Sequence, residues 1–280
     1  MKRRLSDRLV TALMYAVATS VSILFLYPYW WMCLGALRTP RQVLGDPLRL
    51  WPEAWDFSVF WEIGRIGGVD FWVYAWNSVL ITTAATLLGV AVTAMGAYAL
   101  ARKPDLPGFR WLRFGFLVTI MYPYMLLVIP VYVVVFKLGL LGSYAGIVLF
   151  LALGPIQFFL FDQFFRTLPR EVIEAAICDG ASEPQILVRI ILPMAMPVAA
   201  TVTLITFLIT WSQWFPILVI SRSPDTFTLP VALLSMNGEL GSNVRGIMAL
   251  AVVTTLPVAV LFILAQRRVM AGIATGAVKG

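Results

Sequence analysis

The 280-residue sequence contains no histidine, only two cysteines and no GxxxxGK[ST] phosphate-binding loop, and each absence excludes a class of function. Cys33 and Cys178 alone cannot supply the ligands of a zinc or haem site, so we expect no bound metal. Without the phosphate-binding loop the chain cannot hydrolyse ATP by that route. We therefore expect a protein that is not an enzyme and that binds no cofactor of its own.

Charge is also scarce. Charged residues make up 12% of the chain and hydrophobic residues 60%, which excludes an ordinary soluble globular protein. The apolar residues gather in six charge-free stretches, each with room for the roughly 20 residues that cross a bilayer as a helix. The sequence predicts an all-α integral membrane protein, a single domain over 1–280, with six transmembrane helices at about 9–34, 73–101, 114–136, 143–163, 197–220 and 246–266.

The distribution of basic residues predicts the orientation. An even number of spans leaves both termini on one side of the membrane. Most of the 21 Lys and Arg residues lie in the N-terminal arm, after the second predicted span, in the segment 166–193 and in the tail 267–280. Because basic loops stay in the cytoplasm, we expect both termini and these segments there. The same bias accounts for the net charge of +7, and no basic, aromatic-interleaved surface remains to indicate a nucleic-acid partner.

The six stretches carry no acidic or basic side chain in their interior, and Asp162 lies only at the cytoplasmic end of the fourth span. Transporters driven by protons or ions usually keep such groups inside their helices, because a buried charge must be moved or neutralised to couple transport to a gradient. Their absence argues against a secondary transporter, although coupling through backbone carbonyls stays open.

The segment between the fourth and fifth predicted spans reads as two short helices with a turn between them. Pro169 suits a first helical turn, and Gly180 suits the left-handed residue that ends a helix. Ser182 then opens the second helix, with Gln185 three residues later completing a capping box. Pro193 is expected to end or kink this helix.

Seven positions of this segment keep a fixed spacing: Glu174, Ala175, Ala176, Gly180, Ile190, Leu192 and Pro193. The spacing resembles the EAA loop of bacterial ABC importer permeases. In that family the loop, here 166–193, is a cytoplasmic coupling helix that docks on a separate ATPase subunit. The resemblance implies docking residues at Glu174, Ala175, Ala176, Asp179, Gly180, Ile190, Leu192 and Pro193.

The chemistry of these residues suits docking. Two alanines let another backbone approach closely, and Glu174 offers one charge to a basic partner. An elbow that only turns the chain between two spans is the alternative, since Glu-Ala-Ala is common in helices.

Further motifs extend the resemblance over nearly the whole chain. They are Leu37-Arg38-Thr39-Pro40, Trp51-Pro52, Asn77-Ser78, Ala97-Tyr98-Ala99-Leu100-Ala101-Arg102, Tyr122-Pro123, Ile129-Pro130 and Gly276-Ala277-Val278-Lys279-Gly280. Together they are similar to the smaller permease subunit of maltose-type importers. One departure stands out, because Trp211-Ser212-Gln213 occupies the place where such permeases often have Trp-Asn-Glu or Trp-Asn-Asp.

The resemblance implies a heteromeric complex in the cytoplasmic (inner) membrane of a bacterium or archaeon. Its other members would be a second, different permease subunit, a homodimeric ATPase that uses ATP and Mg, and an extracytoplasmic solute-binding protein. In maltose-type importers the tail of this subunit reaches the interface between the ATPase subunits. The resemblance therefore implies an ATPase contact for Ala277, Val278, Lys279 and Gly280.

Aromatic and uncharged polar residues are the candidates for a solute pathway. They are Tyr122, Tyr124, Trp211, Ser212, Gln213 and Trp214. Helical spacing would place Trp211, Trp214 and Phe215 on one face. Aromatic rings with a few hydrogen-bonding groups suit a sugar, which has both C–H faces and hydroxyls. Helix packing or an interfacial belt is the alternative role for the aromatic residues.

These features lead to one functional hypothesis with two rivals. We expect a permease subunit of an ATP-driven, binding-protein-dependent importer, working by alternating access on a sugar or sugar-like solute. An oligosaccharide, a polyol and a glycerol phosphate ester are all compatible with the sequence. The rivals are an ion- or proton-coupled sugar transporter and a membrane scaffold or receptor whose cytoplasmic loop recruits a signalling partner.

Overall fold

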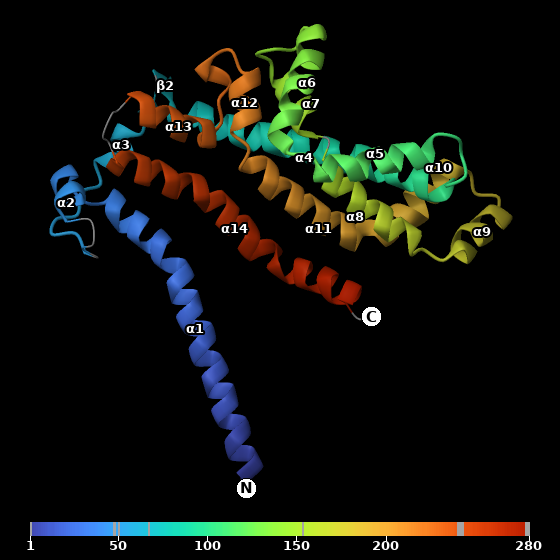
Figure 1. The fold of residues 1–280 in the computed structure, drawn as a ribbon, viewed down its shortest axis with the longest axis horizontal. Coiled ribbons are helices and arrows are strands. Elements are labelled where there is room, and N and C mark those ends of the chain that lie inside the picture. Colours follow the sequence, from blue (N-terminus) through green and yellow to red (C-terminus); the bar gives the residue numbers. More distant parts are fainter. Residues whose placement is uncertain are drawn as a thin grey trace. The chain divides into compact units, whose positions relative to one another are not determined.

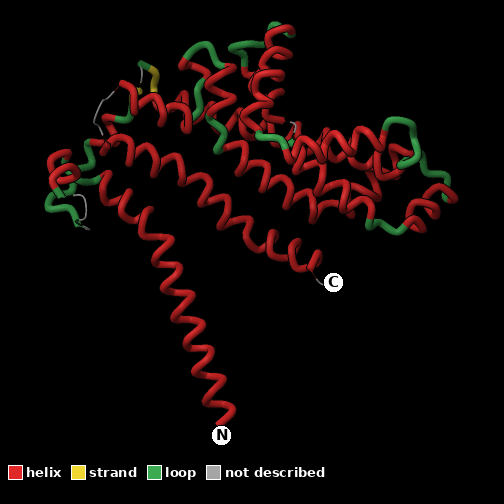
Figure 2. The backbone as a smooth tube through the Cα atoms, in the orientation of Figure 1, coloured by secondary structure: helices red, strands yellow, loops and turns green. Residues whose placement is uncertain are grey.

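A computed structural model describes residues 2–46, 49, 51–66, 68–152, 154–239 and 244–277. The chain divides into two compact units. Unit 1 comprises Met1–Phe71 and Leu233–Leu256, and unit 2 comprises Trp72–Ala232 and Pro257–Gly280. Helices account for most of both units, as the backbone view in Figure 2 shows.

Unit 1 is built from long and short helices and one small hairpin (Figure 1). Its elements are α1 (Lys2–Ala36), α2 (Pro40–Gly45), α3 (Val59–Glu62), the strands β1 (Arg65–Ile66) and β2 (Val69–Asp70), the last part of α13 (Leu229–Glu239) and the first part of α14 (Val244–Ala277). The two strands pair antiparallel, with Ile66 opposite Val69.

Unit 2 contains the predicted coupling segment and most of the remaining helices (Figure 1). Its elements are α4 (Phe71–Arg102), α5 (Phe109–Met121), α6 (Tyr124–Lys137), α7 (Tyr144–Ala152), α8 (Pro155–Arg166), α9 (Arg170–Cys178), α10 (Glu183–Ile186), a π-helical turn (Leu187–Ile191), α11 (Leu192–Trp211), α12 (Phe215–Ile220) and a 3-10 turn (Pro224–Thr226).

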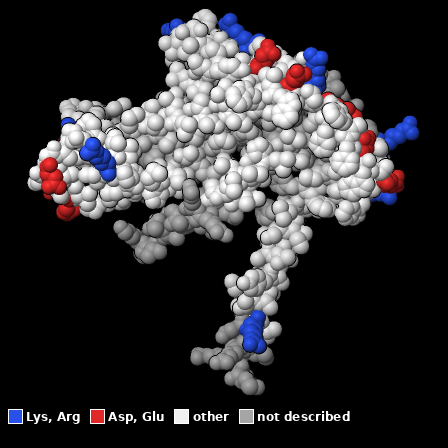
Figure 3. Space-filling model, turned by 180° about the vertical axis from the view of Figure 1, so that it is seen from behind, with Lys and Arg blue, Asp and Glu red and all other residues white. Residues whose placement is uncertain are grey.

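Several of these helices are long and apolar enough to cross a membrane. Within the described residues four pass this test: Arg8–Ala36, Phe71–Arg102, Glu183–Trp211 and Val244–Ala265. A fifth span results if α7 and α8, which meet at a bend of 45°, are taken together. The predicted span 114–136 falls across α5 and α6, so the count of six stays a prediction. On the face that Figure 3 shows, most of the surface carries no charged side chain, as expected for a membrane protein.

Proline explains why the predicted third and fourth spans are each divided. A residue before proline is driven from the helical to the extended conformation. Tyr122, before Pro123, has φ −83° and ψ 134°, and Gly154, before Pro155, has φ −121° and ψ 134°. A new helix begins after each break. Pro130 and Pro257, by contrast, lie inside helices.

One glycine controls the packing of unit 2. A Cβ atom added to Gly89 in α4 would lie 1.9 Å from the carbonyl oxygen of Ala152, at the end of α7. No other residue allows the two backbones to approach so closely. Gly89 therefore fixes where α7 ends against α4.

A buried arginine organises unit 1. The Arg245 side chain, 3% exposed, donates hydrogen bonds to the Asp56 carboxylate at 2.7 Å, to the Asp56 carbonyl at 3.2 Å and to the Ser58 hydroxyl at 3.0 Å. It also reaches the Ala36 carbonyl at 3.3 Å. Hydrogen bonds from the Ser58 backbone and hydroxyl, and then from Arg245, lower the pKa of Asp56 from 3.8 to about 2. The segment after α1 is thereby attached to the start of α14.

We expect Arg245→Met to release this segment, because four oxygen acceptors lose their donor. The measurement is the rate of trypsin cleavage at Arg49 and Arg65, which should rise clearly above the wild-type rate. Arg222→Met, at an exposed position in unit 2, is the control and should leave both cleavages unchanged. Because the pKa of Asp56 is lowered, its contribution to stability is complete above about pH 4 and is lost as the pH falls toward about 2. Equal cleavage rates in the two variants would contradict this role for Arg245.

Candidate functional site

The segment between α8 and α11 forms the predicted elbow. α9 begins after Pro169, whose ψ of 130° is extended, and ends at Cys178, with Asp179 as its C-cap. Gly180 follows with φ +79°, in the left-handed region, and its N–H donates to the Ile177 carbonyl at 2.9 Å. The left-handed turn that the sequence predicts at Gly180 is therefore present.

The second half of the elbow also follows the prediction. The capping box of Ser182 and Gln185 is formed at the start of α10, and the Ser182 N–H donates to the Gln185 side-chain oxygen at 2.9 Å. These contacts satisfy backbone groups that would otherwise be unpaired at the helix start.

Pro193 was predicted to end or kink the helix, and the prediction that the helix ends there is wrong. α10 continues through the π-helical turn into α11, and Pro193 lies in the first turn of α11. The wider turn is seen in the bond from the Leu192 N–H to the Leu187 carbonyl, five residues earlier. The π-helical turn shifts the hydrogen-bond register just before α11. Pro193 therefore lies in the first turn of α11, where the N–H that proline lacks is not needed for an intrahelical bond.

The Glu-Ala-Ala residues do not all face outward. Glu174, Ala175, Asp179 and Gly180 are exposed, whereas Ala176 is only 6% exposed and packs in the core of unit 2 with Ile173 and Ile186. Close approach of another backbone can therefore involve Ala175 but not Ala176. Of the remaining predicted docking residues, Ile190 and Leu192 are half-buried and Pro193 is exposed.

Polar contacts join the elbow to α4. The Arg102 guanidinium lies 3.6 Å from a carboxylate oxygen of Glu183 in α10, and the Tyr98 hydroxyl lies 3.5 Å from the other oxygen. A second pair, Arg113 and Asp162 at 2.8 Å, joins α5 to α8. The sequence analysis did not identify these pairs, because their partners are far apart in the chain.

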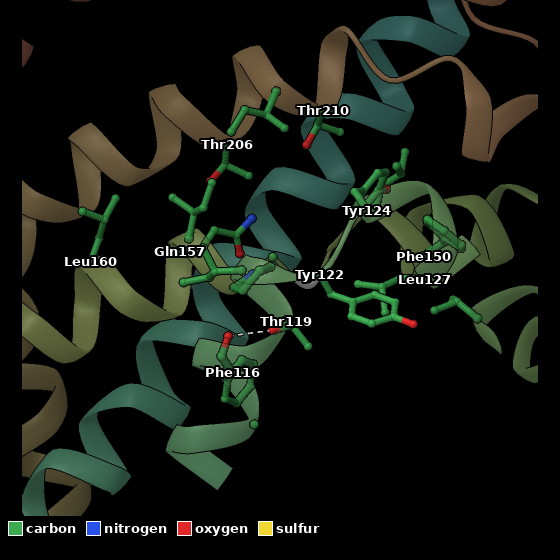
Figure 4. Close-up of a pocket in the computed structure, with 18 of the residues that line it drawn as sticks. Phe116, Thr119, Tyr122, Tyr124, Leu127, Phe150, Gln157, Leu160, Thr206 and Thr210 are labelled. Carbon is green, nitrogen blue, oxygen red and sulfur yellow. Dashed lines mark hydrogen bonds between the residues drawn. The ribbon is translucent and has the colours of Figure 1, made fainter. Parts of the chain in front are cut away.

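A cavity of about 860 Å³ lies in unit 2 among α5, α6, α7, α8 and α11. Figure 4 shows side chains from these helices converging on it. Three of the predicted pathway residues line it: Tyr122, Tyr124 and Gln213. Further polar lining comes from Thr119, Gln157, Thr206 and Thr210, which the sequence analysis missed because each sits singly in an apolar run.

The other three pathway candidates lie elsewhere. Trp211 is buried and stacks on Phe207, with ring centroids 5.8 Å apart. Ser212 donates to the Leu208 carbonyl at 3.0 Å, and Trp214 packs edge-on against Phe215. The predicted common helix face is wrong, because α11 ends at Trp211 and α12 begins only at Phe215.

The predicted ATPase-contacting tail is at the limit of the structure. Ala277 is the last residue of α14. Val278, Lys279 and Gly280 lie outside the described residues.

Comparison with known proteins agrees with this architecture. Residues 93–274 match the family described as binding-protein-dependent transport system inner membrane component. The chain is 30% identical to an arabinooligosaccharides transport system permease protein of Halalkalibacterium halodurans, with 100% of both chains covered. It is 28% identical to a diacetylchitobiose uptake system permease protein of Streptomyces coelicolor, again with 100% of both covered. It is also 27% identical to an sn-glycerol-3-phosphate transport system permease protein of Brucella abortus, covering 90% of this chain and 91% of that one.

The fold has a solved counterpart. A chain of a bacterial ABC transporter involved in the import of the acidic polysaccharide alginate superposes with a TM-score of 0.79 at 24% identity, covering 94% of this chain and 97% of that one. With a family match over most of its length and a full-length relative, this chain belongs to the binding-protein-dependent inner membrane permeases of ABC importers.

Proposed function

We propose that the chain imports a carbohydrate or a related polyol as one permease subunit of an ATP-driven transporter. The observation that carries this proposal is full-length similarity to permeases named for arabinooligosaccharides and diacetylchitobiose. The cavity in unit 2 supports it, since aromatic rings and uncharged polar groups suit sugar hydroxyls and C–H faces.

The partners follow from what this chain lacks. The sequence has no phosphate-binding loop, so ATP and Mg would be used by a separate homodimeric ATPase. A binding protein on the outer side would deliver the solute, as the family description indicates. A second, different permease subunit would complete the pathway. Each of the two subunits would then contribute six spans.

The elbow is the proposed input for the motion. Glu174 and Ala175 are exposed on α9, where an ATPase surface could contact them. Glu183 in the next helix contacts both Tyr98 and Arg102 of α4. A displacement of the elbow would therefore act on the long helix α4 as well as on α11, and the cavity beside them would open alternately to the two sides.

Two variants test the elbow. Glu174→Lys reverses the exposed charge, and Gly180→Val forces a β-branched residue into the left-handed region at φ +79°, at a local cost of about 1–2 kcal/mol. We expect both to reduce solute-stimulated ATP hydrolysis of the reconstituted complex severalfold while the permease still inserts. Glu171→Lys makes the same charge change one turn earlier on α9 and serves as the control. Normal stimulation in Glu174→Lys and Gly180→Val would argue strongly against docking at this elbow.

Orientation is tested by cysteine labelling in a chain whose two native cysteines are replaced by serine. Asp105→Cys lies in the exposed turn between α4 and α5, and Glu53→Cys in the exposed segment before α3. We expect a membrane-impermeant maleimide to label position 105 only from the cytoplasmic side and position 53 only from outside. The opposite pattern would reverse the proposed orientation and remove the elbow from the ATPase.

Deletion of residues 277–280 tests the proposed tail contact. We expect the shortened permease to insert normally but to retain less ATPase on purification, because a contact at the ATPase interface is lost. Retention of ATPase equal to that of the full chain would rule out a role for the tail in docking.

A further inference from the structure

Three side chains of the cavity combine a polar group with almost complete burial. Gln157 of α8 is 6% exposed, and Thr206 and Thr210 of α11 are 3% and 4% exposed. Among the residues that the structure describes, the Thr206 hydroxyl has no hydrogen-bond partner. In Figure 4 this hydroxyl and the Gln157 amide are turned toward the same part of the cavity. An unpaired buried hydroxyl is costly, so a ligand that bonds to it would gain affinity.

The Gln157 amide lies against helix α4. Gln157 follows the break between α7 and α8, and its side-chain oxygen lies 3.4 Å from the Thr93 hydroxyl of α4. A Cβ on Gly89 would stand only 3.0 Å from the same oxygen, so the lack of a side chain there leaves room for the amide. Irregular backbone at membrane depth is tolerated where it lines a cavity, and interrupted helices often form solute sites.

The cavity offers no charge to a ligand. None of the described residues that line it is Lys, Arg, Asp or Glu. Arg113 and Asp162, on the neighbouring helices α5 and α8, pair with each other at 2.8 Å and are not part of the lining. A phosphate or carboxylate entering this site would lose its hydration without gaining a cation, which is strongly unfavourable.

We propose that this cavity is a binding site for an uncharged, polyhydroxylated solute, with Gln157 and Thr206 hydrogen-bonding its hydroxyl groups and the uncharged lining rejecting anions. The inference rests on the proposed function and narrows it. It separates this chain from the relative named for sn-glycerol 3-phosphate and from the structural neighbour that handles an acidic polysaccharide, whose solutes are anionic.

Occupancy of the cavity is measured without the binding protein, so that the solute selectivity of the binding protein does not affect the result. Gln213→Cys places a half-exposed thiol at the cavity in a chain whose Cys33 and Cys178 are replaced by serine. The rate of its alkylation by N-ethylmaleimide is followed in the assembled complex. The probes are arabinobiose, diacetylchitobiose and trehalose as neutral solutes, and glycerol 3-phosphate and dimannuronate as anions. Ser212→Cys, adjacent but outside the lining, is the positional control.

We expect at least one neutral probe to slow alkylation at position 213 and not at 212, and neither anion to do so. Gln157→Leu and Thr206→Val should each weaken this protection, with the half-protecting concentration rising about fivefold for one lost hydrogen bond. Gln163→Leu on α8 and Thr201→Val on α11 change the same residue types outside the lining and should leave it unchanged. The nearly isosteric Thr206→Val keeps the test valid if Gln157→Leu fails to assemble.

Each other outcome overturns the inference. Protection by an anion equal to that by the neutral probes would remove the charge selectivity. Protection by none would mean that lipid or the second permease fills the cavity. Protection unchanged in both Gln157→Leu and Thr206→Val would remove these residues from the site.

Uptake by the complete reconstituted importer with its binding protein separates this inference from the proposed function. ATP-dependent uptake of a neutral probe would agree with both. Uptake of an anion alone would leave an ATP-driven importer standing and overturn the neutral site. Uptake of no probe would overturn both.

Discussion

Backbone groups that are freed where a helix breaks must find partners inside a membrane protein, and this constraint organises the larger unit of the structure. Within the described residues, three of the predicted spans of unit 2 are broken: at Tyr122–Pro123, at Gly154 before Pro155, and over residues 212–214. Each contributes lining to the same cavity, through Tyr122, Gly154 and Gln213. Breaks that would each be unfavourable against lipid are thus gathered around one internal space. The cavity and the broken helices are consequences of a single requirement.

Features that depend on neighbours in the sequence were predicted well. The left-handed Gly180 and the Ser182–Gln185 capping box are fixed by a few consecutive residues, and both are present. Family membership was predicted from motifs of the same local kind. Whether a proline breaks a helix, as at Tyr122–Pro123, or sits inside it, as Pro130 does, depends on packing that the sequence does not display.

Features that depend on distant contacts could not be predicted. Arg245 and Asp56 are 189 positions apart, and nothing in either segment points to the other. Gln157 and Thr206 look like isolated polar residues in apolar helices until the fold brings them to one cavity. The inward position of Ala176 was missed for the same reason, because the motif alone does not show which side of α9 packs against the core. The number of spans and the roles of the docking residues stay predictions.

The inward position of Ala176 bears on the coupling that we propose for the elbow. It belongs to a continuous apolar core with Ile173 and Ile186 of the elbow, and the same core includes Val202 and packs against Leu160, both of which line the cavity. Protein interiors are packed as densely as organic crystals, so a core of this kind moves as a body and does not absorb a displacement by compression. A push on the exposed face of α9 would therefore reach the walls of the cavity through direct contacts. Ala175 would receive the partner, and Ala176, one position later, would pass the displacement to the core.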